Sequence, residues 1–254
     1  MGKLDGRTAI IIGGGFGIGF GSVVRFLEEG ANVVACDISE EGLNNLQKEY
    51  GYKYANQLLT LTCDVNIESD LDNVVLKTIE KFNRVDILAC IAQGGMEHPT
   101  NLLNATSELA LESYKTGPLY TMLMIQKCFP YMKDQGYGRI ITTASGSAVS
   151  GTVGFASYAM AKGAIMSLTR FSAKELGPYG ITVNCFLPVI QGRNFESSPQ
   201  GQGAMEQLKK LIPVGYVGKP YEDASPILTF MASEDSHYMN GQMIGICGGM
   251  QILA

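Results

Sequence analysis

Three side chains in the second half of the chain have the right types and spacing to move a proton. Tyr158 and Lys162 are four residues apart, so on a helix they lie on one face. An ammonium beside a phenol stabilises the phenolate, which predicts a lowered pKa for Tyr158. Ser145 precedes the tyrosine by thirteen residues, and its hydroxyl could polarise the same substrate oxygen. The set predicts proton transfer at an alcohol or ketone oxygen, with Tyr158 as the acid/base.

A glycine-rich loop near the start of the chain predicts a dinucleotide site. The strand-like run 8–12 leads directly into the loop 13–19, with the sequence GGGFGIG, and a helix-like stretch begins at Gly17. Glycines let the backbone approach a pyrophosphate closely, and the first turn of a helix offers unpaired N–H groups. A tight turn without a ligand is the alternative. The residues expected to contact the cofactor here are Gly13, Gly15, Phe16, Gly17 and Ile18.

Two acidic residues at the ends of later strand-like runs bear on which dinucleotide binds. Asp37 follows the run 32–36 and is placed to accept hydrogen bonds from the adenosine ribose. Its carboxylate would repel the 2′-phosphate of NADP, and Phe16 stands where an arginine would bind that phosphate, so we expect NAD rather than NADP. Alternatively, Asp37 caps the following helix together with Ser39. Asp64, after the run 58–63, could bond the adenine amino group or cap a helix.

The elements that must position these residues alternate along the chain. Strand-like runs lie at 8–12, 32–36, 58–63, 87–91, 139–143, 182–186 and 243–246. They are almost continuously apolar, which is typical of parallel strands covered on both faces. Helix-like stretches include 17–29, 68–82, 109–135 and 156–176, and the last two are apolar enough to pack against a partner subunit. The pattern predicts an α/β fold, a doubly wound parallel sheet with helices on both faces.

Composition excludes several other classes of protein. The 254 residues are 46% hydrophobic and 17% charged, which is typical of a folded chain rather than a disordered one. The net charge of −5 predicts no nucleic-acid partner, and no apolar run is long enough to predict a membrane span. The six cysteines are far apart and lack paired ligands, so we expect no metal site and reduced thiols in a cytoplasmic protein.

With these motifs in place, essentially the whole chain resembles the classical short-chain dehydrogenase/reductase family. The loop 13–19 is similar to that family's TGxxxGIG, with Ile12 in place of Thr, and Ser145, Tyr158 and Lys162 match its catalytic set. The resemblance implies a single-domain Rossmann fold over residues 1–254, a seven-stranded sheet, and a homotetramer or homodimer. It also implies that Lys162 holds the nicotinamide ribose and tunes Tyr158, while Ser145 orients the substrate oxygen.

The chain departs from the family's pattern around the cofactor. Where the family has NNAG, residues 90–93 read CIAQ, which predicts an apolar brace for the sheet and a Gln93 side chain projecting towards nicotinamide or substrate. Tyr114 stands in place of the family's other catalytic Asn, which typically supports a water that links the lysine to bulk solvent. Two alternatives stay open: the Tyr114 hydroxyl preserves this proton path, or the path is lost. Pro188 matches the family's PG motif, but Val189 replaces the glycine. The full expected cofactor set is Gly13, Gly15, Phe16, Gly17, Ile18, Asp37, Ile38, Asp64, Val65, Ala92, Gln93, Tyr158, Lys162, Pro188 and Ile190.

The substrate should lie over the nicotinamide, between Ser145 and a substrate-binding loop at about residues 189–213. This loop leaves the carboxyl end of the sheet, where α/β folds bind ligands. The expected lining residues are Ser147, Val153, Phe155, Phe195 and His98, although for His98 a loop residue without a catalytic role is the favoured interpretation.

Together these features predict an NAD-dependent oxidoreductase that interconverts a secondary alcohol and a ketone, with a cyclic substrate as our expectation. Two other functions stay open. One is an NAD(H)-binding scaffold or sensor with little redox activity, which the missing Asn residues suggest. The other is a non-oxidative lyase or epimerase on the same fold.

Overall fold

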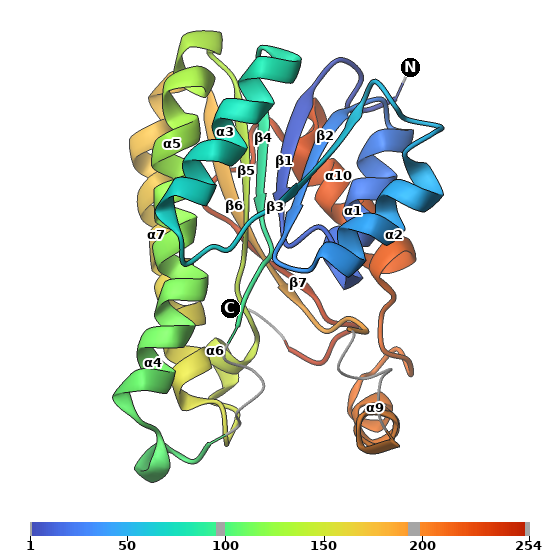
Figure 1. Ribbon diagram of the computed structural model, residues 1–254. Helices are drawn as coiled ribbons and strands as arrows, with labels where there is room; N and C mark the ends of the chain where they lie inside the picture. Colours follow the sequence, from blue (N-terminus) through green and yellow to red (C-terminus); the bar gives the residue numbers. More distant parts are fainter. Residues whose placement is uncertain (1, 95–99, 193–198, 252–254) are drawn as a thin grey trace.

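The computed structural model describes residues 2–94, 100–192 and 199–251. Its centre is a sheet of seven parallel strands in the order β3-β2-β1-β4-β5-β6-β7 (Figure 1). The strands are β1 (Thr8–Ile12), β2 (Asn32–Asp37), β3 (Leu58–Thr62), β4 (Ile87–Cys90), β5 (Gly138–Thr143), β6 (Ile181–Pro188) and β7 (Met243–Ile246). Because β1 pairs with both β2 and β4, the strand order reverses there and leaves a crevice at the carboxyl ends. The predicted doubly wound fold is confirmed.

Helices cover both faces of the sheet. One layer contains α1 (Gly17–Glu28), α2 (Glu40–Tyr50) and α10 (Ser225–Ala232), and the other contains α3 (Glu68–Phe82), α5 (Tyr120–Gln135) and α7 (Ala156–Leu176). Side chains alternate along β1: Ile11 enters the core under α1, while Ile10 and Ile12 enter the core under α5. Burial on both faces explains why the strands read as continuous apolar runs.

The helix predicted over 109–135 is helical along its length, but it is not one regular α-helix. The chain instead forms α4 (Ser107–Tyr114), then a π turn over Lys115–Leu119, and only then α5. Pro118 lies inside the π turn and has no N–H to donate, so the regular helical hydrogen-bond pattern cannot run through it. This break changes the direction in which the residues around Thr116 present their side chains.

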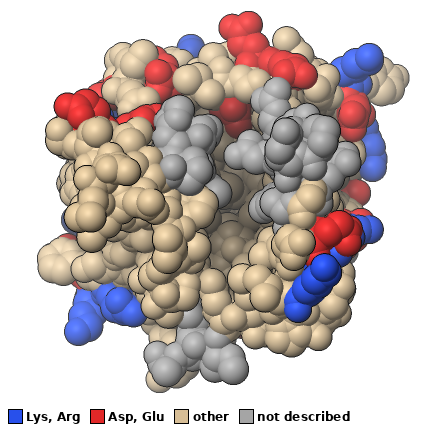
Figure 2. Space-filling view, turned by 90° about the horizontal axis from the view of Figure 1, so that it is seen from below, with Lys and Arg blue, Asp and Glu red and all other residues tan. Residues whose placement is uncertain are grey.

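The carboxyl edge of the sheet carries the remaining short elements, α6 (Ser147–Ser150) and α9 (Pro199–Leu211) (Figure 1). The expected substrate-binding loop at 189–213 is therefore largely helical, because α9 begins at Pro199, a residue suited to the first position of a helix. Seen from this edge, the molecule is hollowed at its centre, and the described residues around the hollow are mostly uncharged (Figure 2).

Two further features bear on the environment of the protein. Within the described residues, no helix combines the length and the apolar character that crossing a membrane requires. All six cysteines are buried free thiols.

Candidate active site

The glycine loop folds tightly over the end of β2. The N–H groups of Gly13 and Gly14 donate to the carbonyl oxygen of Cys36 at 2.7 and 2.8 Å. Gly13 has a φ of +89°, and a Cβ there would lie 2.7 Å from the backbone nitrogen of Ala92. A Cβ at Gly19 would lie 1.7 Å from the carbonyl oxygen of Gly13, because the first turn of α1 packs directly on the loop. The glycines therefore allow the close helix–loop approach that the sequence predicts.

The start of α1 is suited to an anion. Its N-cap residue is Phe16, whose side chain makes no capping hydrogen bond, and the first turn carries no acidic residue. The first N–H groups of a helix lack partners within the helix and carry the positive end of its dipole. The backbone at Gly17 and Ile18 therefore fits the pyrophosphate of a dinucleotide.

A cavity of about 420 Å³ runs beside this loop along the carboxyl ends of β1 to β4. It gathers much of the predicted cofactor set, namely Gly13, Phe16, Asp37, Ile38, Asp64, Val65, Ala92 and Gln93. Its size and its mixture of apolar walls with carboxylates fit the adenosine part of a dinucleotide. The remaining predicted residues lie elsewhere around the loop, on α7 or at the end of β6.

Asp37 borders the cavity and also contacts the start of α2. Its Oδ2 accepts a hydrogen bond from Gly15 N–H at 2.9 Å, and a Cβ at Gly15 would lie equally close to that carboxylate. Its Oδ1 accepts from Ser39 N–H at 2.9 Å, and Ser39 is the N-cap of α2. A carboxylate oxygen can accept more than one hydrogen bond, so these contacts orient Asp37 on the cavity wall without exhausting its capacity.

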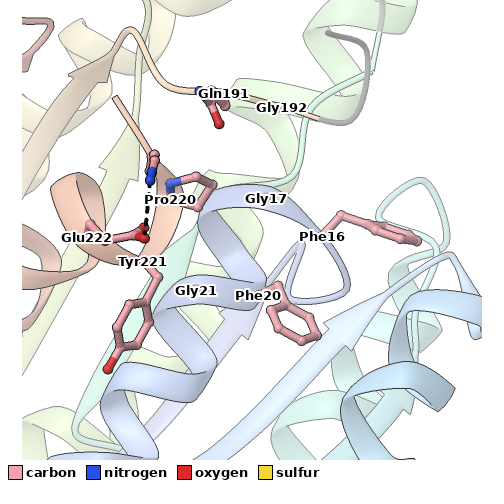
Figure 3. Close-up of a pocket in the computed structure, with 10 residues that line it drawn as sticks. Phe16, Gly17, Phe20, Gly21, Gln191, Gly192, Pro220, Tyr221 and Glu222 are labelled. Carbon is pink, nitrogen blue, oxygen red and sulfur yellow. Dashed lines mark ion pairs between the residues drawn. The ribbon is translucent and has the colours of Figure 1, made fainter. Parts of the chain in front are cut away.

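Other predicted cofactor residues border separate cavities. One of about 460 Å³ opens at the start of α1, between Gly17 and the segment 219–222, where Lys219 and Glu222 pair at 3.8 Å (Figure 3). Another of about 320 Å³ is lined by Ile190, which follows Pro188 at the end of β6. The glycine loop thus lies between the predicted adenosine side and the substrate segment.

Ser145 follows β5 and is held by its own loop. Its Oγ accepts hydrogen bonds from the Ser147 N–H at 3.2 Å and from the Ser147 hydroxyl at 3.0 Å. Because both acceptor positions of the Ser145 oxygen are used, its own hydrogen is free to be donated elsewhere. Ser147, predicted as a substrate residue, therefore contacts Ser145 itself.

Tyr158 and Lys162 lie one turn apart on α7, and both are buried. The Lys162 ammonium lies 5.5 Å from the centre of the Tyr158 ring and donates to the carbonyl oxygen of Thr143 at 2.8 Å. Burial lowers the pKa of Lys162 to about 8. The lysine therefore changes its charge state close to neutral pH.

The predicted lowering of the Tyr158 pKa is wrong in this state of the protein. Burial raises the pKa of the phenol, and the hydrogen bond with Ser145 opposes the rise only in part. Desolvation disfavours the phenolate, while the Lys162 ammonium bonds to a backbone carbonyl oxygen instead of the phenol.

The apolar brace predicted at the end of β4 is present. Cys90 is buried in the core under α5, and Ile91 packs against the opposite core. The Thr143 hydroxyl donates to the carbonyl oxygen of Cys90 at 2.7 Å, and the Tyr120 hydroxyl donates to that of Ala92 at 2.9 Å. These bonds tie the backbone after β4 to β5 and α5.

The Gln93 side chain is oriented differently from the prediction, and Tyr114 lies away from the cavity. Gln93 borders the cavity, but its amide nitrogen turns to the Ser113 carbonyl oxygen at 3.0 Å and the Thr116 hydroxyl at 3.3 Å, not towards a substrate. Tyr114 ends α4 with 48% of its surface exposed and lies outside the residues that line this cavity.

The predicted substrate residues are only partly brought together. Phe155 packs edge-on against Tyr158, with the ring centres 6.2 Å apart. Val153 is 86% exposed and lines none of the cavities described above. Phe195 and His98 lie outside the described residues.

Sequence reasoning missed three residues at this edge. A Cβ at Gly146 would lie 1.6 Å from the Gln251 amide nitrogen, so this glutamine fills the space beside the serine loop. No motif marks Gln251, because the contact depends on the path of the chain after β7. Gly94 and Thr116 line the cofactor cavity but carry no signal in the sequence beyond their nearness to Gln93 and Tyr114.

Comparisons with known proteins agree with this geometry. A family model described as enoyl-(acyl carrier protein) reductase matches residues 14–251. The chain is 34% identical over 260 residues to 12α-hydroxysteroid dehydrogenase of a Clostridium species, with 98% of each chain covered. It is 32% identical over 251 residues to the 3-oxoacyl-[acyl-carrier-protein] reductase FabG of Thermotoga maritima, with 98% of this chain and 100% of the relative covered.

A solved structure shares the complete fold. The 7α-hydroxysteroid dehydrogenase in complex with NADH and 7-oxo glycochenodeoxycholic acid superposes with a TM-score of 0.89 at 29% identity, covering 97% of this chain and 95% of that one. The family match, the relatives and the fold span nearly the whole chain. The protein therefore belongs to the short-chain dehydrogenase/reductase family and is an oxidoreductase that acts on CH–OH and C=O groups.

Proposed function

We propose that this enzyme uses NAD(H) to interconvert a cyclic secondary alcohol and the corresponding ketone, with Ser145, Tyr158 and Lys162 as its catalytic residues. The observation that carries the proposal is this trio at the carboxyl edge of the sheet, with the Ser145 hydroxyl close to the Tyr158 phenol and the Lys162 ammonium beside the same ring. When bound, a nicotinamide supplies the carbon that gives or takes the hydride. The chain's own residues manage the substrate oxygen and its proton.

In the reductive direction, Ser145 and Tyr158 act on the ketone oxygen. Ser145 donates its free hydrogen to that oxygen and orients it, while Tyr158 donates its proton. Because burial raises the pKa of Tyr158, the phenol is protonated at neutral pH and ready for this step. Lys162, whose pKa is about 8, stabilises the resulting phenolate as long as it carries its charge.

The choice of NAD over NADP rests on Asp37. Its carboxylate faces the cavity beside Gly15, where it would accept hydrogen bonds from ribose hydroxyls and repel a 2′-phosphate. The backbone at Gly17 and Ile18 would hold the pyrophosphate, and Lys162 the nicotinamide ribose. The relative structure bound to NADH supports this assignment.

A cyclic, largely apolar substrate is supported by two observations. Segment 189–213 carries Val189 and Ile190, which line an apolar cavity with Ile244 and Ile246 of β7. Relatives named for hydroxysteroids share almost the full length of this chain. A 3-oxoacyl thioester is the competing substrate class, since a relative of similar identity is named for it.

Self-association is part of the proposal. An apolar groove of about 610 Å³ lies between α5 and α7, and Phe171 on its rim is 62% exposed. We infer that a second copy covers this surface in a homodimer or homotetramer. Light scattering should show an oligomer for the wild type and a monomer for Phe171→Glu.

The buried free thiols support a cytoplasmic location.

The experiment that tests the function follows nicotinamide absorbance with NAD and NADP, in both directions, over a panel of cyclic and steroidal alcohols and ketones and a 3-oxoacyl thioester. Tyr158→Phe runs beside the wild type. We expect NAD-linked turnover of a cyclic substrate and a loss of about three orders of magnitude in the variant, since positioned acid/base groups contribute about 10²–10⁴.

The other outcomes identify the alternatives. Tight NADH binding without turnover of any compound would favour a scaffold or sensor. Product formation without a net absorbance change would favour a lyase or epimerase, and unchanged turnover in Tyr158→Phe would remove Tyr158 as the acid/base.

A further inference from the structure

A compact hydrogen-bond cluster centred on Gln93 joins the chain after β4 to the π turn. The Gln93 amide nitrogen donates to the carbonyl oxygens of Gly94 and Ser113 at 2.9 and 3.0 Å and to the Thr116 hydroxyl at 3.3 Å. Gly94 N–H donates to the same hydroxyl at 3.2 Å, and that hydroxyl donates to the Glu112 carbonyl oxygen at 2.7 Å. Gln93, Gly94 and Thr116 all line the cofactor cavity. The cluster is therefore part of the cavity wall.

The Gln93 side chain sits in a notch over Gly117. A Cβ at Gly117 would lie 2.5 Å from Gln93 Oε1, so only glycine leaves room for the amide. Within the described part of the chain, no donor reaches this buried oxygen, and none reaches the buried Ser113 hydroxyl. A buried acceptor without a donor costs free energy. The hydrogen bonds of the amide nitrogen thus hold the Gln93 side chain here, although the amide oxygen is left without a donor.

The π turn makes such a connection necessary. A π turn is locally unfavourable compared with α-helix and commonly lies at functional sites. Here it spans Lys115–Leu119, and Thr116 is the residue through which it reaches the cavity. Without the Gln93 amide, Thr116 would keep only Gly94 N–H as a donor to its hydroxyl.

We propose that Gln93 is a positioning residue that fixes Gly94 and Thr116 as one wall of the NAD(H) site. The inference rests on the proposed cofactor site. In it, Gln93 holds the cavity wall in place and does not contact the substrate. It follows that losing the amide should weaken cofactor binding beyond its effect on folding.

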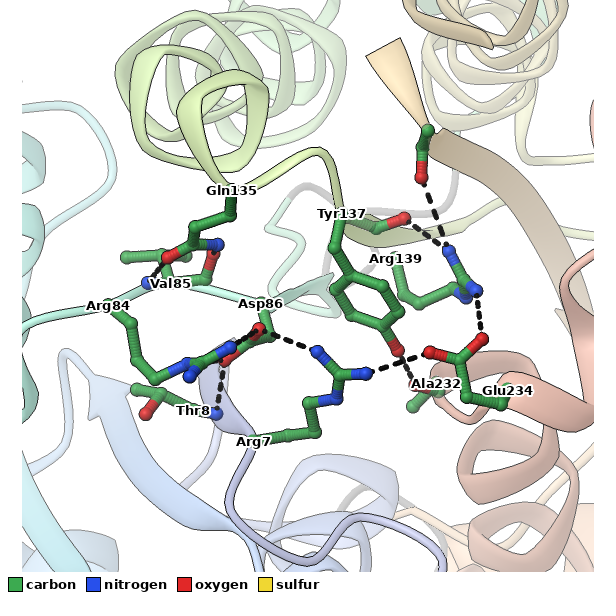
Figure 4. A network of polar contacts seen from close by, with 12 residues as sticks. Arg7, Thr8, Arg84, Val85, Asp86, Gln135, Tyr137, Arg139, Ala232 and Glu234 are labelled. Atoms are coloured by element: carbon green, nitrogen blue, oxygen red, sulfur yellow. Dashed lines mark hydrogen bonds and ion pairs between the residues drawn. The ribbon is translucent and has the colours of Figure 1, made fainter.

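The test compares Gln93→Ala with a matched control, Gln135→Ala. The Gln135 amide also joins two elements, because its nitrogen donates to the Val85 carbonyl oxygen at 2.7 Å and its oxygen accepts from Val85 N–H at 3.3 Å. It lies at the amino end of the sheet, away from the cavity (Figure 4). NADH binding is measured by fluorescence titration, with melting temperature in parallel. We expect both variants to melt lower because each loses hydrogen bonds within the protein, but only Gln93→Ala to bind NADH about tenfold more weakly.

A second variant gives a signature that a structural defect alone would not produce. Gln93→Glu places a carboxylate oxygen against two carbonyl oxygens and a hydroxyl oxygen that here accepts. Only the protonated carboxyl can donate, so its NADH affinity should recover towards the wild-type value as the pH falls from about 8 to about 6. Gln93→Ala should show no such recovery relative to wild type.

A double-mutant cycle tests the route through Thr116. Thr116→Val removes the hydroxyl that Gln93 and Gly94 share, and we expect its effect on the NADH dissociation constant to be less than multiplicative with that of Gln93→Ala. Equal NADH affinity in Gln93→Ala and Gln135→Ala would overturn the inference. A wild-type protein that binds no NADH would instead overturn the proposed function.

Discussion

At the amino end of the sheet, charged side chains from distant parts of the chain neutralise one another, whereas at the carboxyl end several buried polar groups have no partner among the described residues (Figure 4). Asp86 is fully buried, yet its carboxylate accepts from Thr8 N–H and from the guanidinium groups of Arg7 and Arg84. Arg139 donates to Glu234 and to surrounding carbonyl oxygens. The charged groups at this end satisfy one another, and the Thr182 hydroxyl is the one buried polar group there without a partner among the described residues.

Aromatic packing completes the amino-end network. The Tyr137 ring lies against two guanidinium groups, 3.6 Å from that of Arg7 and 4.3 Å from that of Arg139. Cation–π contacts of this kind add attraction without requiring further charge. Every charge in this network is thereby committed to another group of the protein, so no binding capacity is left.

The carboxyl end shows the opposite arrangement. The first turn of α1 has no side-chain cap, and the Gln93 and Gln251 side-chain oxygens have no donor among the described residues. Lys162 is buried against a carbonyl oxygen rather than a carboxylate. Groups left in this way destabilise the folded protein, and under the proposed function the start of α1 and Lys162 serve the cofactor. The two ends of the same strands therefore differ in role: the amino end stabilises the fold, and the carboxyl end carries the proposed site. Four substitutions test this difference.

The largest effect is expected at the amino end. Asp86→Ala leaves Arg7 and Arg84 without their shared carboxylate and removes the acceptor for Thr8 N–H. Breaking a buried ion pair typically costs 3–5 kcal/mol, and because both arginines are partly exposed we expect about 3 kcal/mol. Urea unfolding measures the loss, with exposed Asp134→Ala as the control. Turnover per folded molecule should stay unchanged, and a proportionate loss of turnover would break the separation of the two ends.

Lys162→Met tests whether the buried Lys162 ammonium lowers the free energy of unfolding. The Lys162 pKa is about 8 when folded, against 10.5 for the ordinary side chain, so between these values the unfolded chain binds more protons. The contribution of Lys162 to the free energy of unfolding should therefore rise with pH from about 8 to about 10.5, by about 3 kcal/mol at about 1.4 kcal/mol per pKa unit, while the buried thiols, whose pKa values are raised, lose stability as the pH rises. The free energy of unfolding of Lys162→Met should therefore fall relative to that of the wild type, by this amount, between these two pH values.

The control for that experiment is Lys174→Met, on the exposed side of the same helix, which should follow the wild-type curve. Denaturant unfolding of cofactor-free protein across pH 7 to 11 supplies the comparison. Parallel curves for the wild type and Lys162→Met would mean that the buried lysine carries no such cost.

Asp37→Asn tests whether the Asp37 charge selects NAD over NADP, and the expected change is of intermediate size. The amide keeps one oxygen acceptor for the loop but loses the charge that disfavours a 2′-phosphate. We expect the ratio of kcat/KM for NADP to that for NAD to rise by about tenfold to a hundredfold, a change of about 1.4–2.8 kcal/mol. Ser39→Ala removes only the cap of α2, and it should lower the melting temperature without altering the ratio. An unchanged ratio in Asp37→Asn would leave Asp37 with its structural contacts alone.

Much of this architecture follows from the sequence. β1, β7, α3 and α7 begin and end at the predicted residues, because hydrophobic period and glycine or polar boundaries agree there. The glycine loop and the Ser145–Tyr158–Lys162 set were also predictable, since each motif is local in the sequence. The π turn at Lys115–Leu119 was missed because the helical pattern continues on both sides of it and only Gly117 and Pro118 mark it.

The missed contacts share a physical cause. Gln251 meets Gly146, and Arg7 meets Asp86, across separations that no local pattern encodes. The direction of the Tyr158 pKa shift was wrong for a related reason: sequence spacing gives the neighbour, but the shift depends on burial, which is a property of the assembled fold.

The smallest predicted effect concerns how the Ser145 hydrogen is directed. In the structure, the Ser147 hydroxyl and N–H both donate to Ser145 Oγ, which turns the remaining hydrogen outward. Ser147→Ala keeps the N–H but removes the hydroxyl, so the Ser145 hydrogen gains a competing orientation. The loss of one neutral hydrogen bond is worth about 1 kcal/mol, which predicts about a fivefold lower kcat with little change in stability. Ser150→Ala, which removes a hydroxyl from the same short helix, should leave kcat unchanged. If both variants lowered kcat equally, the effect would come from α6 as a whole, and the carboxyl end would depend on its loop packing rather than on a directed hydroxyl.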